Sequence, residues 1–545
     1  MAGGRLHTDN PELLAYTEGR LHITVLGGIK LTGLDRLRVT LKLTLGSKPE
    51  KAYRHNLDLY NGIQCGQLAE RASEALDMTE SELSQTLNHL TAALEGYRTE
   101  RLEAMKPKQA ERKQLSEAER KEALKFLKSN HLLQRTAEAI AASGIVGEET
   151  NAMVAYLVYT SRKRRVPLHL MCLGASGTGK TWLQEKVSEL MPEEDKLEIT
   201  TLSSNAFYYF GREELRHRLL LIEDLDGAES VLYPLRELQS KRRISKTVTL
   251  KDNKGNLKTV TLEVEGPVCV SGCTTREKLY EDNANRCILL YMDGSAEQDG
   301  RIMDYQRKLS AGLVDEAAQR KVKERMKNIQ RLLQPISVRN PYATYLQLPE
   351  AVFKPRRTML LLLLFTETVT WYHQYQRKPK TDTDTGEQYI ESTPEDIAAA
   401  FALLEDTLLK KSDELSDACR GFFEQLKAYL RKQGTDSFYS RDVRGPLRVS
   451  PSSLGRYLYE LERTGHIRII KGNRYKGFEY KVPQWDDLEI LSGNTRKLIE
   501  GILHTIKACP GTSGSVTRNP RVTQPTGGLH KTQKTNGKGA VTHGS

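Results

Sequence analysis

Residues 174–181 read Gly-Ala-Ser-Gly-Thr-Gly-Lys-Thr and directly follow the apolar stretch 166–173. A glycine-rich loop between a strand and a helix presents backbone amides to phosphate, and the helix N-terminus adds positive potential. In such a loop the lysine reaches the β- and γ-phosphates, and the final hydroxyl binds Mg²⁺. The sequence therefore predicts an α/β fold that binds ATP and Mg²⁺ through Gly174, Ala175, Ser176, Gly177, Thr178, Gly179, Lys180 and Thr181.

A second apolar stretch, 219–222, ends in the acids Glu223 and Asp224. Together with Lys180 and Thr181, such a pair would hold Mg²⁺ and orient the attacking water. The usual order is Asp before Glu, and here it is reversed. Which acid would be the metal ligand and which the base stays open, with Asp226 as a third candidate.

A third apolar stretch, 267–271, runs into Gly-Cys-Thr-Thr, so Ser271 and Thr274 are candidates to contact the γ-phosphate. A hydroxyl-capped turn is the alternative. Arg286 precedes a further apolar stretch, 287–290. An arginine at a subunit edge can stabilise charge on a neighbour's γ-phosphate, although a solvated arginine would look the same in sequence.

Between the acidic strand and the third stretch lies a basic segment with alternating residues. Residues 243–250 and 257–262 flank Asp-Asn-Lys-Gly-Asn, which predicts a β-hairpin. A solvated edge is one interpretation of its lysines. The other is a DNA contact through Lys246, Lys251, Lys254 and Lys258.

Taken in this order, residues 140–375 resemble the AAA+ superfamily, in particular the minichromosome maintenance and superfamily 3 helicases. More narrowly they look like helicase-type ATPases of bacterial mobile elements. The resemblance implies an adenine pocket at Ile145, Val146 and Gly147, and a second sensor at Arg356 and Arg357. It also implies a hexameric ring in which Arg286 acts in trans, a hairpin that grips DNA, and a replication or primase partner.

The predicted domain order places a winged helix after the ATPase core. Its second helix would present Arg456 and Tyr457 to DNA, and its wing, turning at 471–473, would present Lys471, Arg474 and Lys476. Winged helices also bind proteins, so sequence-specific reading stays open. The expected domains are a strand-rich α+β domain (1–98), a charged helical linker (99–130), the AAA+ core (131–377), a polar linker (378–392), helices with the winged helix (393–485), and a helix with a disordered basic tail (486–545).

Composition narrows the class of protein. At 545 residues the chain exceeds a single core, and its net charge of +12 suits a nucleic-acid partner. The apolar run 359–365 is too short for a membrane helix, and seven scattered cysteines favour reduced thiols, so no membrane association and a cytoplasmic location are expected. We expect the basic run 162–165 to be a solvated edge or a phosphate contact.

These features favour a ring-forming ATP-dependent DNA helicase or translocase of a mobile element. Two rivals remain: an AAA+ ATPase that remodels or loads other proteins on DNA, and a nucleotide-gated DNA-binding protein with little turnover. What the N-terminal domain recognises is not determined, since its strand cations Arg36, Arg38 and Lys42 could contact DNA or simply coat a sheet.

Overall fold

The computed structural model describes residues 4–31, 35–46, 48–105, 112–200, 205–227, 231–251, 257–275, 281–473 and 477–508. The chain forms two compact units, residues 1–111 and 112–545. Each unit has its own core and is described by itself. No helix within the described residues is long and apolar enough to cross a membrane.

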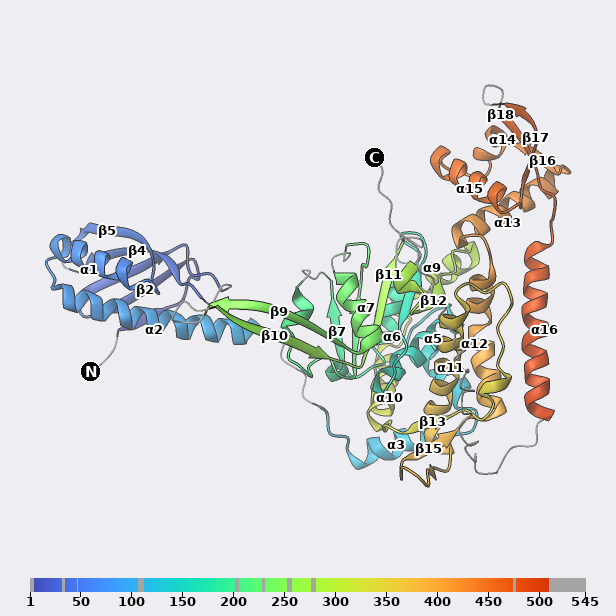
Figure 1. Cartoon of the computed structure of the whole chain (residues 1–545), viewed down its shortest axis with the longest axis horizontal. Coiled ribbons are helices and arrows are strands. Elements are labelled where there is room, and N and C mark those ends of the chain that lie inside the picture. The colour runs from blue at the N-terminus through green and yellow to red at the C-terminus, as the bar shows by residue number, and fades with distance from the viewer. Residues whose placement is uncertain are drawn as a thin grey trace, which may run out of the picture. The chain divides into compact units, whose positions relative to one another are not determined.

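The first unit is an antiparallel sheet of five strands in chain order, followed by two helices (Figure 1). Alternation along the strands buries one face of the sheet, as in β3 and β4, where every second residue is buried. The second helix runs unbroken through the predicted domain boundary at residue 98. The elements are β1 (Arg5–His7), β2 (Leu13–Glu18), β3 (Leu21–Leu26), β4 (Arg38–Leu45), β5 (Lys48–Asp58), α1 (Gly62–Leu76) and α2 (Glu80–Met105).

The second unit is built around a parallel sheet with the strand order β12-β6-β11-β8-β7. All residues of β6 and β11 are buried, as expected for strands covered on both faces. The predicted α/β core is thereby confirmed. The strands are β6 (Leu170–Leu173), β7 (Lys196–Ile199), β8 (Arg218–Ile222), β11 (Val268–Thr274) and β12 (Ile288–Tyr291).

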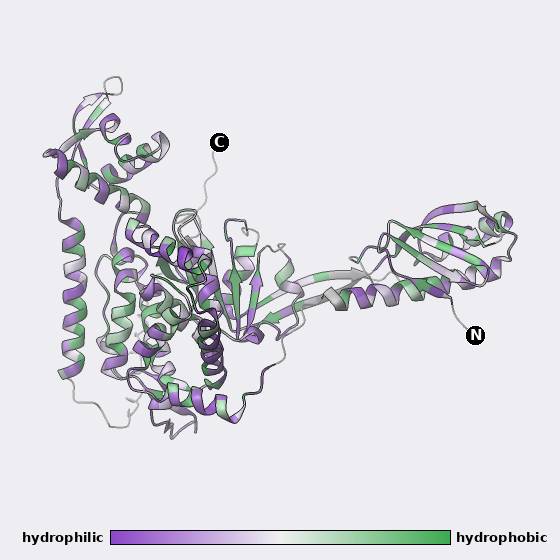
Figure 2. Ribbon diagram, turned by 180° about the vertical axis from the view of Figure 1, so that it is seen from behind, coloured by the Kyte–Doolittle hydropathy of each residue, from purple (hydrophilic) through white to green (hydrophobic). Residues whose placement is uncertain are grey.

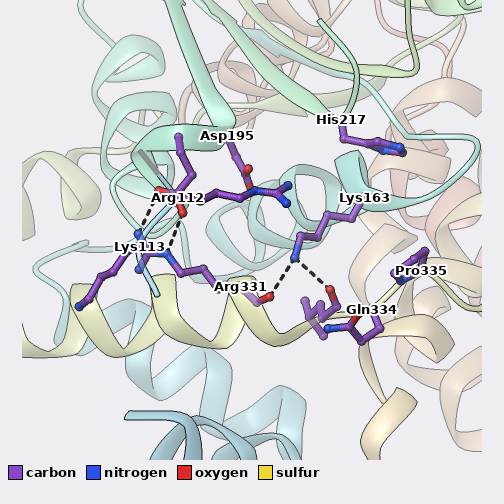
Figure 3. Close-up of a pocket in the computed structure, with 10 residues that line it drawn as sticks. Arg112, Lys113, Lys163, Asp195, His217, Arg331, Gln334 and Pro335 are labelled. Carbon is purple, nitrogen blue, oxygen red and sulfur yellow. Dashed lines mark hydrogen bonds and ion pairs between the residues drawn. The ribbon is translucent and has the colours of Figure 1, made fainter. Parts of the chain in front are cut away.

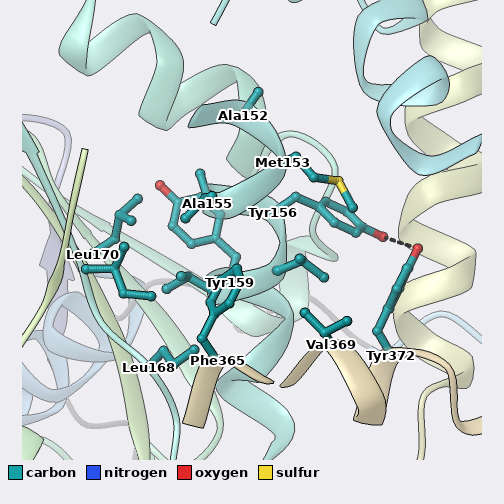
Figure 4. Packing of buried hydrophobic residues seen from close by; sticks show 14 of the residues in the cluster. Ala152, Met153, Ala155, Tyr156, Tyr159, Leu168, Leu170, Phe365, Val369 and Tyr372 are labelled. Atoms are coloured by element: carbon teal, nitrogen blue, oxygen red, sulfur yellow. Dashed lines mark hydrogen bonds between the residues drawn. The ribbon is translucent and has the colours of Figure 1, made fainter. Parts of the chain in front are cut away.

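Helices pack on this sheet through one large apolar cluster. The helix α5 is buried at every position from Ala152 to Thr160. Its Tyr156 and Tyr159 lie among side chains that include Phe365 and Tyr372 of α11, and the hydroxyls of Tyr156 and Tyr372 are 3.5 Å apart (Figure 4). The helices of this region are α3 (Glu117–Leu127), α4 (Leu132–Ala142), α5 (Glu149–Thr160), α6 (Lys180–Ser188), α7 (Leu232–Lys241), α8 (Glu281–Ala284), α9 (Ala296–Ser310), α10 (Glu316–Leu332) and α11 (Pro355–Tyr372).

The predicted hairpin is present as β9 (Arg243–Lys251) and β10 (Leu257–Glu265). Nine residue pairs connect the two strands, from Leu257 opposite Lys251 to Glu265 opposite Arg243. The sequence thus predicted both strands of the hairpin, and the residues between them lie outside the described part of the chain.

The basic run 162–165 is mostly interior, contrary to the expectation of a solvated edge. Arg162 is fully buried, and its guanidinium donates to Asp195 at 2.6 Å and to Gln330 at 2.8 Å. The Lys163 ammonium donates to backbone carbonyls at the end of α10, those of Gln330 at 2.6 Å and Leu333 at 2.9 Å. Figure 3 shows it pointing toward Arg331, whose carbonyl is 3.4 Å away. These cations therefore join the segment before β6 to α10.

Lys163 also lines a cavity of about 370 Å³ together with Asp195, and there burial lowers the pKa of Lys163 to about 7. Arg164 pairs with Glu367 of α11 at 2.5 Å, and Arg165 alone of the run is exposed.

The predicted polar linker 378–392 is ordered as part of a small sheet. Its strands β14 (Lys380–Thr381) and β15 (Gln388–Glu391) join β13 (Ser337–Arg339), and Ile390 is fully buried. The expectation of a linker was wrong because a core residue and the ion pair of Arg339 with Asp382 anchor the segment.

The remaining chain is largely helical. Helix α12 (Pro394–Ser412) lies along β12, and its Thr407 hydroxyl donates to the Leu289 carbonyl at 3.2 Å. Helix α16 (Asp487–Ala508) alternates hydrophobic and hydrophilic residues (Figure 2) and packs on α12. Between them lie α13 (Asp417–Gln433), β16 (Ser437–Tyr439), α14 (Ser440–Arg444), α15 (Pro451–Arg463), β17 (Arg468–Asn473) and β18 (Gly477–Lys481), in the order expected of a winged helix.

Candidate nucleotide-binding site

The glycine-rich loop leaves β6 at Leu173 and enters α6 at Lys180. Gly177 and Gly179 have φ of +84° and +86°, in the left-handed region that glycine adopts without strain. The loop can therefore curl tightly and present its amides. Because Gly179 is the N-cap of α6, the positive end of that helix points at the loop.

Lys180 lies over this loop. Its ammonium donates to the carbonyl oxygens of Gly174 at 2.9 Å and Ala175 at 2.6 Å, and the residue is 8% exposed. The Thr178 hydroxyl donates to the same Ala175 carbonyl at 2.9 Å. The cation is thus held within the loop at the place where the β- and γ-phosphates would be bound.

Three predicted motifs meet because β6, β8 and β11 are parallel neighbours whose carboxyl ends share one edge of the sheet. A cavity of about 510 Å³ opens there. It brings together the loop, the acidic pair and the threonines after β11. Its lining comprises Ser176, Gly177, Gly179, Lys180, Thr181, Trp182, Glu223, Asp224, Asp226, Cys273, Thr274 and Thr275. Trp182 and Cys273 were not predicted as site residues.

Asp226 connects the acidic strand end to the end of β11. Its carboxylate accepts hydrogen bonds from the Thr274 hydroxyl at 2.6 Å, the Thr275 hydroxyl at 2.7 Å and the Thr275 amide at 3.0 Å. The Asp226 amide in turn donates to the Asp224 carboxylate at 2.8 Å. This carboxylate therefore fixes two cavity threonines relative to the acidic pair.

Ser271, predicted as a phosphate contact, does not line the cavity. It is fully buried, and its hydroxyl is hydrogen-bonded to that of Tyr159 at 2.9 Å. Ser271 lies in the middle of β11, two residues before Cys273 on the same face, whereas the cavity opens at the carboxyl end of the strand. The cavity is instead reached by Cys273, whose thiol donates to the Gln184 amide oxygen at 2.7 Å.

The donor set fits Mg²⁺, which prefers hydroxyl and carboxylate oxygens and shares substrate phosphates. Thr181 and Glu223 are half-buried and Asp224 is exposed at the cavity. Within the described residues no group of three or more His, Cys, Asp or Glu side chains could hold a metal unaided. Thr181 with Glu223 or Asp224 would hold the ion together with the phosphates.

Arg286 lies away from this cavity. It precedes the amino end of β12, whose Ile288 is opposite Leu170 at the start of β6, whereas the glycine-rich loop follows the carboxyl end of β6. Its side chain donates to the Ser240 hydroxyl of α7 at 2.8 Å. The length of a strand therefore separates Arg286 from the loop of its own chain.

The residues predicted to surround adenine are packed inside the protein. Ile145 belongs to the main core, and the Val146 carbonyl accepts a hydrogen bond from Gln298 at 3.2 Å. Gly147 lies so close to Gln298 that a Cβ would come within 2.0 Å of it. A neighbouring cavity of about 650 Å³ is lined by residues that include Glu148, Glu149, Thr150 and Asn151. Burial raises the pKa of the Glu148 carboxyl.

The predicted second sensor is likewise not assembled within this chain. Arg356 and Arg357 are exposed in the first turn of α11 and do not line the cavity at the loop.

Among the predicted DNA contacts, Lys246 is engaged at the hairpin base. Its ammonium donates to Asn205 at 2.7 Å and lies 5.6 Å from the centre of the Tyr208 ring. Lys251 and Lys258 belong to the paired ends of β9 and β10, and Lys254 lies outside the described residues.

In the region predicted to form a winged helix Arg456 is exposed, and Lys471 is exposed but paired with Glu479 at 3.1 Å. Tyr457 stacks on Phe422 with ring centres 5.1 Å apart, so the exposed aromatic residue of α15 is Tyr459. The predicted turn at 471–473 instead belongs to β17, which runs to Asn473, and Asn473 pairs with Gly477 of β18. Arg474 and Lys476 lie outside the described part of the chain.

Residues 116–335 match a family model described as the MTBMA_p00010 P-loop domain, and none of the curated proteins matches the chain. Among solved structures, a full-length MCM homolog from Methanopyrus kandleri aligns with a TM-score of 0.36 and 15% identity over 55% of this chain and 63% of that one.

Drosophila ORC bound to DNA aligns with a TM-score of 0.22 and 13% identity, over 73% of this chain and 98% of that chain. The C-terminal region of NrS-1 gives 0.20 and 13%, over 68% of this chain and 76% of that chain. The chain thus spans less than two thirds of the MCM homolog, and structural likenesses this distant carry no functional argument. The family model, together with the loop and the cavity at its edge, shows that the chain contains a P-loop domain.

Proposed function

We propose that the chain is an ATPase that acts as a ring-forming DNA helicase or translocase, serving replication or transfer of a mobile element. The observation that carries this is the convergence of Lys180, the acidic pair and Thr274 on one cavity, with the hairpin leading directly into the strand that ends there. Strand β10 ends at Glu265 and β11 begins at Val268.

The roles of the residues follow from their positions. Lys180 and the loop amides would bind the phosphates, and Thr181 with one acid of the pair would hold Mg²⁺. The other acid would orient the attacking water, and Thr274 would contact the γ-phosphate. When bound, Mg²⁺ would neutralise part of the negative charge on the phosphate oxygens.

Arg286 supports a multimeric assembly. Because it lies at the opposite end of the sheet from the loop of its own chain, it could reach a γ-phosphate only in a neighbouring copy. Such trans-acting arginines contribute about 10³ to 10⁵ in rate in related enzymes. A closed ring, taken to be hexameric by resemblance, would give every loop such a neighbour.

The hairpin offers a route from hydrolysis to movement. Its backbone is anchored at the base, where the Gly266 amide donates to the Arg242 carbonyl at 2.6 Å and the Glu265 amide donates to the Arg212 carbonyl at 2.7 Å. A shift of Thr274 on phosphate release would move β11 and, through this base, the hairpin. Lys251, Lys254 and Lys258 would carry that movement to a DNA backbone.

The test is ATP-dependent unwinding of a forked DNA duplex by the full chain, with Lys180→Ala as the matched control. Unwinding that the variant loses would support the helicase. In a second arm, Lys254→Ala with Lys258→Ala should reduce DNA-stimulated hydrolysis far more than basal hydrolysis. Equal effects on both rates would remove the hairpin from the mechanism.

A second candidate, an ATPase that remodels or loads proteins on DNA, is favoured by the surface of the winged-helix region. Tyr459 is 69% exposed and Ile470 53% exposed, and aromatic and aliphatic side chains on a surface are typical of protein contacts. ATP hydrolysis without strand separation would favour this candidate. DNA binding with negligible hydrolysis would instead favour a nucleotide-gated DNA-binding protein.

A further inference from the structure

The sheet of the first unit has one face covered by helices and one face uncovered. Leu14, Ile23 and Leu41 face a core shared with Leu68 of α1 and Leu87 of α2. The alternate residues of the same strands point the other way, because successive side chains of a strand lie on opposite faces. Many of these outward residues are exposed or half-exposed.

The uncovered face carries cations from strands at both sides of the sheet. Arg5 comes from β1, Arg38 and Lys42 from β4, and Arg54 from β5; these four residues are here called the basic sheet face. Lys42 lies directly opposite Arg54 in the β4–β5 register. Like charges placed opposite one another destabilise a sheet, so stability of the fold does not account for this pairing.

Among the residues that the structure describes, the cations of the basic sheet face have no acidic partners. Within the described residues, none of the four forms an ion pair, whereas Arg162 and Arg164 of the second unit are both paired with buried or half-buried acids. The outward acid Asp58 uses its carboxylate on the amides of Leu37 at 2.9 Å and Tyr60 at 3.2 Å. The charge of this face is therefore available to a partner.

The side chains between the cations suit a phosphate backbone. Thr24 is the register neighbour of Lys42, and Thr40 accepts a hydrogen bond from Asn56 at 2.9 Å, so hydroxyl and amide groups lie beside the charges. The aromatic residues of the sheet, Tyr16 and Tyr53, contact the helix-covered core. The described strands present no Phe, Tyr or Trp ring on this face for stacking on bases, and the outward rings among the described residues are the imidazoles of His7 in β1 and His22 in β3.

The extent of the face also fits a nucleic-acid strand. Arg38 and Lys42 are four residues apart on one strand, which corresponds to roughly 14 Å at about 3.4 Å per residue. That distance spans several phosphates of a strand. An apolar centre, which a stable protein interface requires, is lacking, because the large outward apolar residues Leu13 and Leu26 are paired with each other at one end.

We propose that the basic sheet face binds the phosphodiester backbone of nucleic acid without regard to base sequence. The inference does not depend on ATP turnover or on the hairpin. On this proposal the N-terminal unit binds nucleic acid without ATP hydrolysis.

The test is binding of a labelled single-stranded DNA of about 20 nucleotides to the full chain without nucleotide, measured by fluorescence anisotropy over a range of salt concentrations. The test variant is Arg38→Gln/Lys42→Gln/Arg54→Gln. The matched control, Arg20→Gln/Lys30→Gln/Arg71→Gln, removes the same charge from two turns and helix α1 of the same unit.

Each phosphate contact contributes a slope of about 0.7 to the dependence of log affinity on log salt for single strands. Losing three contacts should lower that slope by about 2 and weaken binding about a hundredfold at about 0.1 M salt. The control should keep the wild-type slope. A charge-retaining variant, Arg38→Lys/Arg54→Lys, should also keep it, because an ammonium still pairs with phosphate.

Equal losses in the test and control triples would overturn the proposal, since net charge alone would then explain binding. No loss in the test triple would overturn it as well. Both measurements are repeated with Lys180→Ala, so that failure of the ATPase proposal and failure of this one are told apart. Homopolymers of different bases should bind alike, and a preference among them of more than about tenfold would contradict backbone recognition.

Discussion

Asp226 offers a sharp test of the nucleotide site, because it touches the two threonines of the cavity and is not part of the loop. Replacing it by Asn keeps its size and turns one carboxylate oxygen into an amide that can only donate. Both oxygens now accept: one from the Thr274 hydroxyl, the other from the Thr275 amide and hydroxyl. In one orientation the new NH2 group faces the Thr275 amide and that hydrogen bond is lost. In the other the Thr274 hydroxyl has to accept instead of donate, and in both the acceptor loses its negative charge.

Hydrogen bonds to charged groups contribute about 1.5–3 kcal/mol, and for this half-buried carboxylate the lower end applies. A loss of about 1.4 kcal/mol in transition-state stabilisation slows a reaction about tenfold. Asp226→Asn should therefore lower kcat for ATP hydrolysis about tenfold. The affinity for nucleotide should stay within about twofold, because Lys180 and the loop amides are unchanged.

The assay combines steady-state hydrolysis with equilibrium binding of a fluorescent ADP analogue. Thr275→Val removes the hydroxyl that donates to the Asp226 carboxylate, so it breaks the same hydrogen bond as Asp226→Asn. The double variant Asp226→Asn/Thr275→Val should therefore hydrolyse ATP no more slowly than the slower single variant. If kcat and nucleotide affinity fell by the same factor, Asp226 would itself bind the nucleotide or its metal, and the reasoning would be refuted. Additive losses in the double variant would refute it equally.

Three further outcomes follow from the structure. Gly177→Ala should strain the loop by about 1–2 kcal/mol, because a Cβ meets no neighbour there but φ is +84°. A loop that keeps its conformation lowers thermal stability by this amount, and a loop that relaxes binds nucleotide more weakly by this amount, as read from thermal melting and equilibrium binding. Arg162→Met should destabilise the second unit by about 3–5 kcal/mol in denaturant unfolding by leaving Asp195 buried and unpaired, and Arg162→Met/Asp195→Leu should recover most of it. Burial lowers the pKa of Lys411 from 10.5 to about 8, so between these pH values the unfolded chain binds more protons than the folded chain. The free energy of unfolding should therefore rise with pH from about 8 to 10.5. Lys411→Met should remove this rise and raise the free energy of unfolding at pH 7 by up to about 3 kcal/mol, as read from thermal melting.

Much of the P-loop core could be predicted because its signals are local. The glycine-rich loop, the apolar strand ending in Glu223 and the two hairpin strands each occupy a short stretch whose residue types determine its conformation. That the glycine-rich loop and the acidic strand end meet at one edge follows from the parallel sheet. The burial of Ser271 is not evident from the sequence, because its hydroxyl partner Tyr159 lies 112 residues away.

Other features depend on residues far apart in the chain. Arg162 is hydrogen-bonded to Gln330, 168 residues away in the sequence, and Arg164 to Glu367, 203 residues away. A basic run with distant partners cannot be told from a solvated one by composition. The structure of residues 378–392 likewise depends on β13, about fifty residues earlier in the chain. β13 pairs with β15, and the Ser337 hydroxyl donates a hydrogen bond to the Glu387 carboxylate.

The contact between α12 and β12 has a consequence for how the chain can be divided. β12 is an edge strand, and an edge strand that exposes unpaired carbonyls can recruit a strand of another molecule. Thr407 occupies one such carbonyl, that of Leu289, and α12 lies along the strand. A shortened chain that stopped before Pro394 would uncover this edge, and we expect it to self-associate by strand pairing. Helix α12 therefore protects the β12 edge from aggregation, and a minimal fragment of the P-loop core has to retain it.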